Sequence, residues 1–251
     1  MEPFEGLRPA PSLNHLDRLR GGTAEPLCER WDLPTGFEAY ARVLHRSPDG
    51  PWSEIDPVRL TRADGVNFCT RYLACDGILD EDLLLLLLDR LTAHTAATDD
   101  CHFEVWGGWG TINLAWEPES HWPFVRTTST WASASGGHDD LRPKLDLRSQ
   151  RERAMLEFLR GCPHVDLDNG RGCFYVDGPL GAITSIGTPG WEPGEVHRVG
   201  VSRWWPADRS WLVATDMDGE WTYVAGSRQL IDQILAEPPV DAVEVFTSDT
   251  W

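Results

Sequence analysis

Lysine is almost absent from this 251-residue sequence, because 21 of its 22 basic residues are arginine and Lys144 is the one lysine. A Walker-type phosphate loop, which needs Gly-Lys followed by Ser or Thr, therefore does not occur. A Schiff-base lysine would have to be Lys144 itself. The shortage excludes most chemistry that depends on an amine side chain, and the arginine excess is typical of a GC-rich genome.

The common catalytic signatures are missing as well. The sequence contains no Gly-x-Ser-x-Gly, no His-Glu-x-x-His and no strand followed by Gly-x-Gly-x-x-Gly. Its six cysteines form no Cys-x-x-Cys pair. Five side chains in the middle of the chain also fail to match the spacing of a closed zinc site: Cys69, Cys75, His94, Cys101 and His102. We therefore assign no catalytic residue, no metal and no cofactor.

Basic charge is scarce too, with 22 basic against 40 acidic residues and a net charge of −18. Such a surface repels phosphates and anionic lipid headgroups, so we expect neither nucleic-acid nor membrane binding. A basic protein partner is favoured, although net charge also serves solubility alone. The polar, proline-bearing first ten residues predict no signal peptide, which favours a soluble, cytoplasmic protein with reduced thiols.

The hydrophobic pattern predicts one α+β domain over residues 36–251, preceded by an irregular lead-in over residues 1–35 that contains five prolines and a short helix near residues 12–20. Residues 36–46 alternate between apolar and polar side chains, as a strand does. Residues 80–97 contain six consecutive leucines and predict a helix that is apolar on all sides and buried deep in the core.

The remaining elements follow from turns and caps. Asp-Asn-Gly and Asp-Gly turns predict two hairpins, and Ser227 is a helix N-cap candidate. We expect a mostly antiparallel sheet, a mobile loop near residues 127–140, and a C-terminal strand-helix-strand. The predicted segments are strands at 101–106, 165–167, 173–176, 211–215, 221–225 and 240–246, and helices at 149–160 and 228–236. A further strand is predicted at 111–116, beyond the glycine-rich turn.

Thirteen tryptophans are the most unusual feature that is present. An indole offers a flat apolar face and one N–H donor, which suits ligand or partner contacts, although most tryptophans pack in cores. Adjacent strand residues point to opposite faces, so we expect at least one indole of the Trp204-Trp205 pair to be exposed, beside Arg203 or Asp208. Trp106 and Trp109, which flank glycines, complete the aromatic candidates.

Alternating carboxylates at Asp216, Asp218 and Glu220 are the other binding candidates. The Asp-Gly turn alone also explains them. Two functions remain open. The first is an acidic, Trp-rich interaction protein, for example of the immunity type, which recognises a basic protein. The alternative is a small-ligand-binding protein or enzyme with an aromatic pocket and these carboxylates.

Three stretches, residues 36–46, 94–110 and above all 203–235, resemble a family of actinobacterial cytoplasmic proteins with no assigned function. The resemblance covers about a quarter of the chain and implies a soluble protein from a GC-rich bacterium. It carries no catalytic residue over. The chain departs from the family pattern at Ser202 and Arg203, where the family has an Asn-Leu pair before the two tryptophans.

Overall fold

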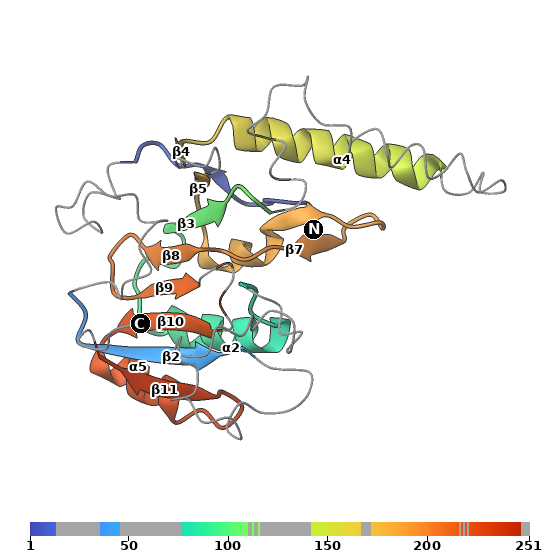
Figure 1. Cartoon of the computed structure of the whole chain (residues 1–251). Helices are drawn as coiled ribbons and strands as arrows, with labels where there is room; N and C mark the ends of the chain where they lie inside the picture. Colours follow the sequence, from blue (N-terminus) through green and yellow to red (C-terminus); the bar gives the residue numbers. More distant parts are fainter. Residues whose placement is uncertain are drawn as a thin grey trace, which may run out of the picture.

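An antiparallel sheet runs through the molecule, as the computed structural model in Figure 1 shows. Within the described part of the chain this sheet has nine strands. The structure describes residues 1–13, 36–45, 77–109, 112, 115, 142–166, 172–215, 217, 219 and 221–246. The strands are β1 (Arg8–Pro9), β2 (Ala39–Leu44), β3 (Cys101–Trp106), β4 (His164–Asp166), β5 (Gly172–Gly178), β8 (Arg203–Pro206), β9 (Leu212–Thr215), β10 (Trp221–Gly226) and β11 (Ala242–Val245).

The strands lie in the order β1-β5-β3-β8-β9-β10-β2-β11, and β4 also pairs with β5. A separate two-stranded sheet contains β6 (Gly187–Pro189) and β7 (Val196–Arg198). Every pairing between described strands is antiparallel. The helices are α2 (Glu81–Thr92), α4 (Arg142–Arg160), α5 (Arg228–Leu235) and the 3₁₀ helix η6 (Leu180–Ser185).

The predicted combination of helices with a mostly antiparallel sheet is confirmed. Strand β4 pairs with β5, β9 pairs with β10, and β10, α5 and β11 follow one another. Ser227 caps α5, because its hydroxyl accepts a hydrogen bond from the N–H of Leu230. Helix α4 begins seven residues before the predicted 149, at Arg142.

Some predicted segments differ or lie elsewhere. The irregular lead-in is wrong for residues 8–9, which form β1 beside β5, and Phe4 is buried in the core. The short helix near residues 12–20 and the loop at residues 127–140 lie outside the described residues, apart from residues 12 and 13. Of the strand predicted at residues 111–116, only 112 and 115 are described, and both are 3₁₀. No helix that the structure describes is long and apolar enough to cross a membrane.

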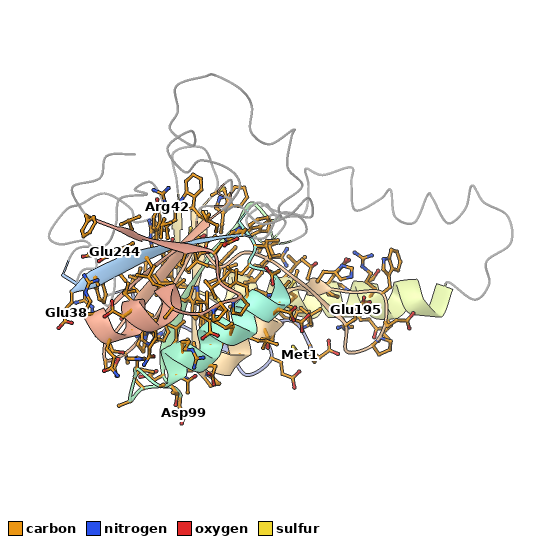
Figure 2. The ribbon with its side chains drawn as sticks, turned by 90° about the horizontal axis from the view of Figure 1, so that it is seen from below. Met1, Glu38, Arg42, Asp99, Glu195 and Glu244 are labelled. Carbon is orange, nitrogen blue, oxygen red and sulfur yellow. The ribbon has the colours of Figure 1, made fainter. Side chains whose placement is uncertain are left out.

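Both faces of the sheet are buried. On the first face, strand side chains such as Val43, Phe103 and Trp204 pack with α2, α4 and α5 in one hydrophobic cluster. The second face has its own cluster, which includes Tyr175, Trp205 and the other residues that alternate with the first set. Figure 2 shows α2 and α5 on one side of the sheet and Arg42 on the other. The period-2 pattern of the strands therefore separates two cores rather than a core and a solvent face.

Helix α2 is less deeply buried than its six leucines predict. Leu83, Leu87 and Leu91 are buried at i, i+4 and i+8, and Leu84 lies beside them, but Leu85 is 49% exposed. The helix covers one face of the sheet, so its outer side faces solvent whatever residues stand there. The prediction that all sides are covered is wrong, and so is the extension of the helix to residue 97.

Replacing Leu87 by Ala should lower the free energy of unfolding by about 2–5 kcal/mol, because the side chain is fully buried and the change leaves a cavity. Leu85→Ala is the matched control, and it should change stability by no more than about 0.5 kcal/mol. Urea unfolding of both variants measures the difference. Equal losses would contradict the burial pattern of α2.

Candidate functional site

The structure buries both members of the tryptophan pair, so the prediction that one indole is exposed is wrong. Trp204 and Trp205 are each 1% exposed. Trp204 packs edge-on against Trp211, with ring centroids 5.6 Å apart, in the cluster on the helical face. Trp205 lies on the second face beside His102, with ring centroids 5.5 Å apart. The pair points to opposite faces as expected, but each face is covered.

Arg203 is also buried, and its partner is inside the protein. Its Nη1 lies 3.0 Å from Oε1 of Glu104, which is fully buried. The hydroxyl of Tyr175 donates to the other carboxylate oxygen of Glu104 at 3.1 Å. The two carboxylate oxygens thus have separate partners. Arg203 therefore pairs with a group inside the protein and contributes to the fold. The prediction that it borders an exposed indole is wrong.

Trp106 and Trp109 do lie together, at the end of β3. Their rings meet edge to face with centroids 5.7 Å apart, and both are partly buried. A Cβ at Gly108 would overlap the ring of Trp106, so the turn between them requires glycine. Trp106 packs against the second-face cluster and Trp109 against the first. The two indoles therefore pack against different hydrophobic clusters and do not form one binding surface.

The three predicted carboxylates, Asp216, Asp218 and Glu220, lie outside the described residues. Within the described part of the chain, no group of three or more histidine, cysteine, aspartate or glutamate side chains is placed to hold a metal. Burial raises the pKa of the Cys101 and Cys162 thiols to about 12. The acids near Cys101 add to its rise. These two cysteines are protonated at neutral pH and are poor nucleophiles.

Charged residues line the second face of the sheet in cross-strand rows that the sequence did not reveal. Glu104 is directly opposite both Tyr175 and Arg203 in the strand register. In the next row, His102 Nδ1 lies 2.8 Å from Oδ1 of Asp177. The i, i+2 spacing of His102 and Glu104 places them on one face, but only the pairing of strands distant in sequence supplies their partners.

Arg42 continues this face on β2. Its guanidinium lies over the rings of Trp221 and Tyr223, 5.2 and 5.7 Å from the ring centroids. Arg42 is buried, so it holds the aromatic side chains of β10 in place as a desolvated cation–π partner. Glu104, Arg203, Tyr175, His102 and Asp177 of the second face are thus partners of one another, and Arg42 contacts aromatic rings. This arrangement explains how so much charge is buried.

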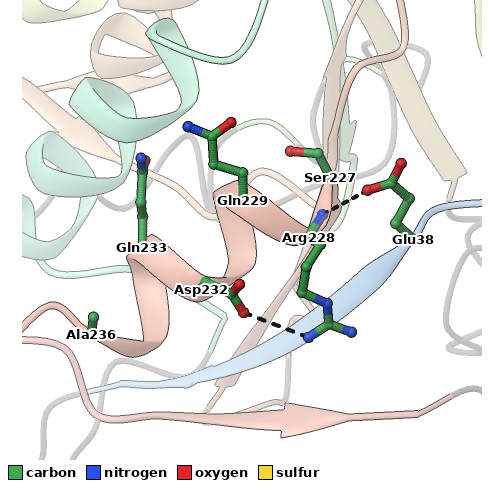
Figure 3. Close-up of a pocket in the computed structure, with 7 residues that line it drawn as sticks. All are labelled: Glu38, Ser227, Arg228, Gln229, Asp232, Gln233 and Ala236. Atoms are coloured by element: carbon green, nitrogen blue, oxygen red, sulfur yellow. Dashed lines mark hydrogen bonds and ion pairs between the residues drawn. The ribbon is translucent and has the colours of Figure 1, made fainter.

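The exposed candidate is a corner of the molecule where β2 begins, β11 ends and α5 starts. Two hollows meet there, one of about 640 Å³ along α5 and one of about 370 Å³ between β2 and β11. Both include Glu38 and Arg228 (Figure 3). We call this region the acidic corner and define it by Glu38, Asp232 and Glu244.

Arg228 is the base within the acidic corner, and it is fully engaged by carboxylates. Its backbone N–H donates to Glu38 at 2.9 Å, and its guanidinium pairs with Asp232, as Figure 3 shows. The guanidinium also pairs with Glu244. The hydrogen bond that the guanidinium donates to Glu244 raises the pKa of Arg228. The corner therefore presents more negative than positive charge to solvent. Nothing in the sequence pattern indicated it, because Glu38 is 190 positions from Arg228 in the chain.

The chain was compared with protein-family models, with curated proteins and with solved structures, and none of the three comparisons finds a match.

Proposed function

We propose that this chain is an interaction protein that recognises a basic protein partner through its acidic surface. An immunity protein that neutralises a basic toxin is the kind of protein meant. The observation that carries the proposal is the acidic corner, where carboxylates surround an arginine that they already neutralise. The net charge of −18 supports it, because opposite charge accelerates encounter and disfavours wrong partners. The proposal includes a relationship of this chain to the family of actinobacterial cytoplasmic proteins that it resembles.

Several arginines are paired within the protein, and this pairing affects the charge that the surface presents. Glu104 and Arg203 pair internally, and Arg42 is covered by aromatic rings. Arg90 on α2 is likewise tied to Glu237, with 2.6 Å between Nη2 and Oε2. These three arginines are therefore engaged with the protein's own groups, and its acids dominate the potential that a partner meets.

The alternative, a ligand-binding protein or enzyme with an aromatic pocket, has less support. The hollow beside Trp204 holds only about 20 Å³, room for a water molecule, and no carboxylate lines it. The hollow along α5 has carboxylates but no aromatic lining. The 370 Å³ hollow has both, but its aromatic residues are phenylalanine and tyrosine. Tryptophan and carboxylate do not meet in these three hollows.

Capture from the source lysate tests the proposal. The immobilised wild-type protein should retain a basic protein at low salt and release it at high salt, because exposed charges are screened. The variant with Glu38→Gln, Asp232→Asn and Glu244→Gln should bind the purified partner about tenfold more weakly or worse. A control variant with Glu81→Gln, Asp89→Asn and Glu157→Gln removes the same charge elsewhere on the surface and should bind like wild type. Capture of no basic protein, or equal loss in both variants, would contradict the proposal.

A further inference from the structure

Strand β11 ends the described strand order of the sheet, and its outer edge lies at the acidic corner. Among the residues that the structure describes, no strand pairs with β11 on the side away from β2. The N–H of Leu44 donates to the carbonyl of Asp241 at 2.8 Å, and these two residues are opposite each other in the register. Backbone groups alternate in direction along an antiparallel strand, so those of Ala242 and Glu244 point away from β2.

A hollow lies at the end of β11, next to this edge. The 370 Å³ hollow lies where β2 begins and β11 ends, and Phe246, which is 55% exposed, lines it with Phe37 and Tyr40. Gly36 at the rim has a φ of +95°, and no atom lies within 4 Å of the position a Cβ would take. No proline stands within β11 to block pairing. Among the described residues, therefore, no strand and no proline blocks the outward backbone groups of β11, and a hollow lies at its end.

The side chains along the edge specify what kind of strand fits. Glu244 points to the helical side, because it pairs with Arg228 of α5, whereas Val243 and Val245 pack with the second-face cluster. A strand added antiparallel to β11 would place its own alternate side chains beside these two sets. Basic residues suit the side of Glu244 and Asp232, and apolar residues suit the side of Val243.

We infer that the edge of β11 takes up an extended, basic segment of the partner protein as an additional antiparallel strand. This inference rests on the proposed function and specifies how the partner binds at the acidic corner. Main-chain hydrogen bonds from Ala242 and Glu244 supply affinity, and the alternation of basic and apolar side chains supplies specificity. A second copy of the chain is a poor occupant, because two molecules of net charge −18 repel each other at this corner.

A synthetic probe tests the inference directly: a fluorescent eight-residue peptide of alternating arginine and valine, followed by anisotropy. A residue opposite Glu244 shares its face and directs its N–H toward β11, so arginine N–H groups make the bonds. N-methylation of the arginine residues should weaken binding roughly tenfold or more, whereas N-methylation of the valine residues should leave binding unchanged. A peptide of alternating glutamate and valine should not bind.

Protein variants complete the test. Ala242→Pro removes an N–H that points away from β2 and leaves the hydrogen bonds between β11 and β2 intact. This variant should bind both methylated peptides weakly, so the difference between the two peptides should disappear. If thermal melting shows that the Ala242→Pro variant has a folding defect, the Phe246→Ser variant is used instead. Leu85→Ser, at a side chain of similar exposure, is then the control. Binding that is indifferent to N-methylation would overturn strand addition and leave the proposed function standing. Absence of peptide binding together with absence of a captured basic protein would overturn both. A dimer that Ala242→Pro dissociates would identify a second copy as the occupant and overturn the inference.

Discussion

Replacing Glu104 by Ala should lower the free energy of unfolding by about 3–5 kcal/mol, one of the largest effects expected for a single change in this chain. The substitution leaves the guanidinium of Arg203 buried without its carboxylate partner, 3.0 Å away in the wild type. It also removes the acceptor of the Tyr175 hydroxyl. The cost comes mainly from the uncompensated buried charge and not from the value of the ion pair itself.

A double variant distinguishes these two sources. Glu104→Leu with Arg203→Met removes both charges and keeps apolar volume at both sites, so it should be markedly more stable than Glu104→Ala. Chemical denaturation of the wild type and of both variants measures the difference. A double variant that loses as much as the single one would show that the pair contributes through geometry rather than by neutralising charge.

Trp205→Ala should destabilise the protein by about 3–5 kcal/mol, because the indole is 1% exposed and fills the second face between strands. Trp191→Ala is the control at an exposed indole, which is 46% exposed and lies under Arg148 with 4.3 Å between the guanidinium carbon and the ring centroid. Its loss should stay within about 1 kcal/mol. Calorimetric melting would contradict the buried assignment if both variants melted alike.

The same variants bear on function. An exposed contact residue weakens partner binding when it is truncated but leaves melting nearly unchanged. We expect the reverse for Trp205. The residues that matter for the partner should instead be found at the acidic corner.

The local elements of the fold were predictable from the sequence, because their signals are local. Alternation predicted β2, Ser227 predicted the start of α5, and the Asp-Gly turn predicted the hairpin of β9 and β10. Each signal depends on residues that lie close together in the chain. The physical cause is short-range backbone geometry and hydrogen bonding, which neighbouring residues determine.

The predictions that were wrong concern features that depend on contacts between residues distant in the sequence. Exposure of Leu85 depends on how much of α2 the sheet covers, and burial of Trp205 depends on cover over the second face. Glu104 and Arg203 are 99 positions apart and become partners only through the register of β3 with β8. Neither composition nor the spacing of residues predicts the register of β3 with β8. The acidic corner was missed for the same reason.

The position of β2 in the sheet has a consequence for synthesis on the ribosome. Strand β2 lies early in the chain, but both of its neighbours, β10 and β11, belong to the last strands to be made. Its backbone groups therefore have no sheet partner until nearly the whole polypeptide has emerged, and long-range pairing of this kind is slow. Nascent chains should expose residues 39–44 as an unpaired strand throughout elongation, and a chain that stops before β10 should leave them available to chaperones and to aggregation.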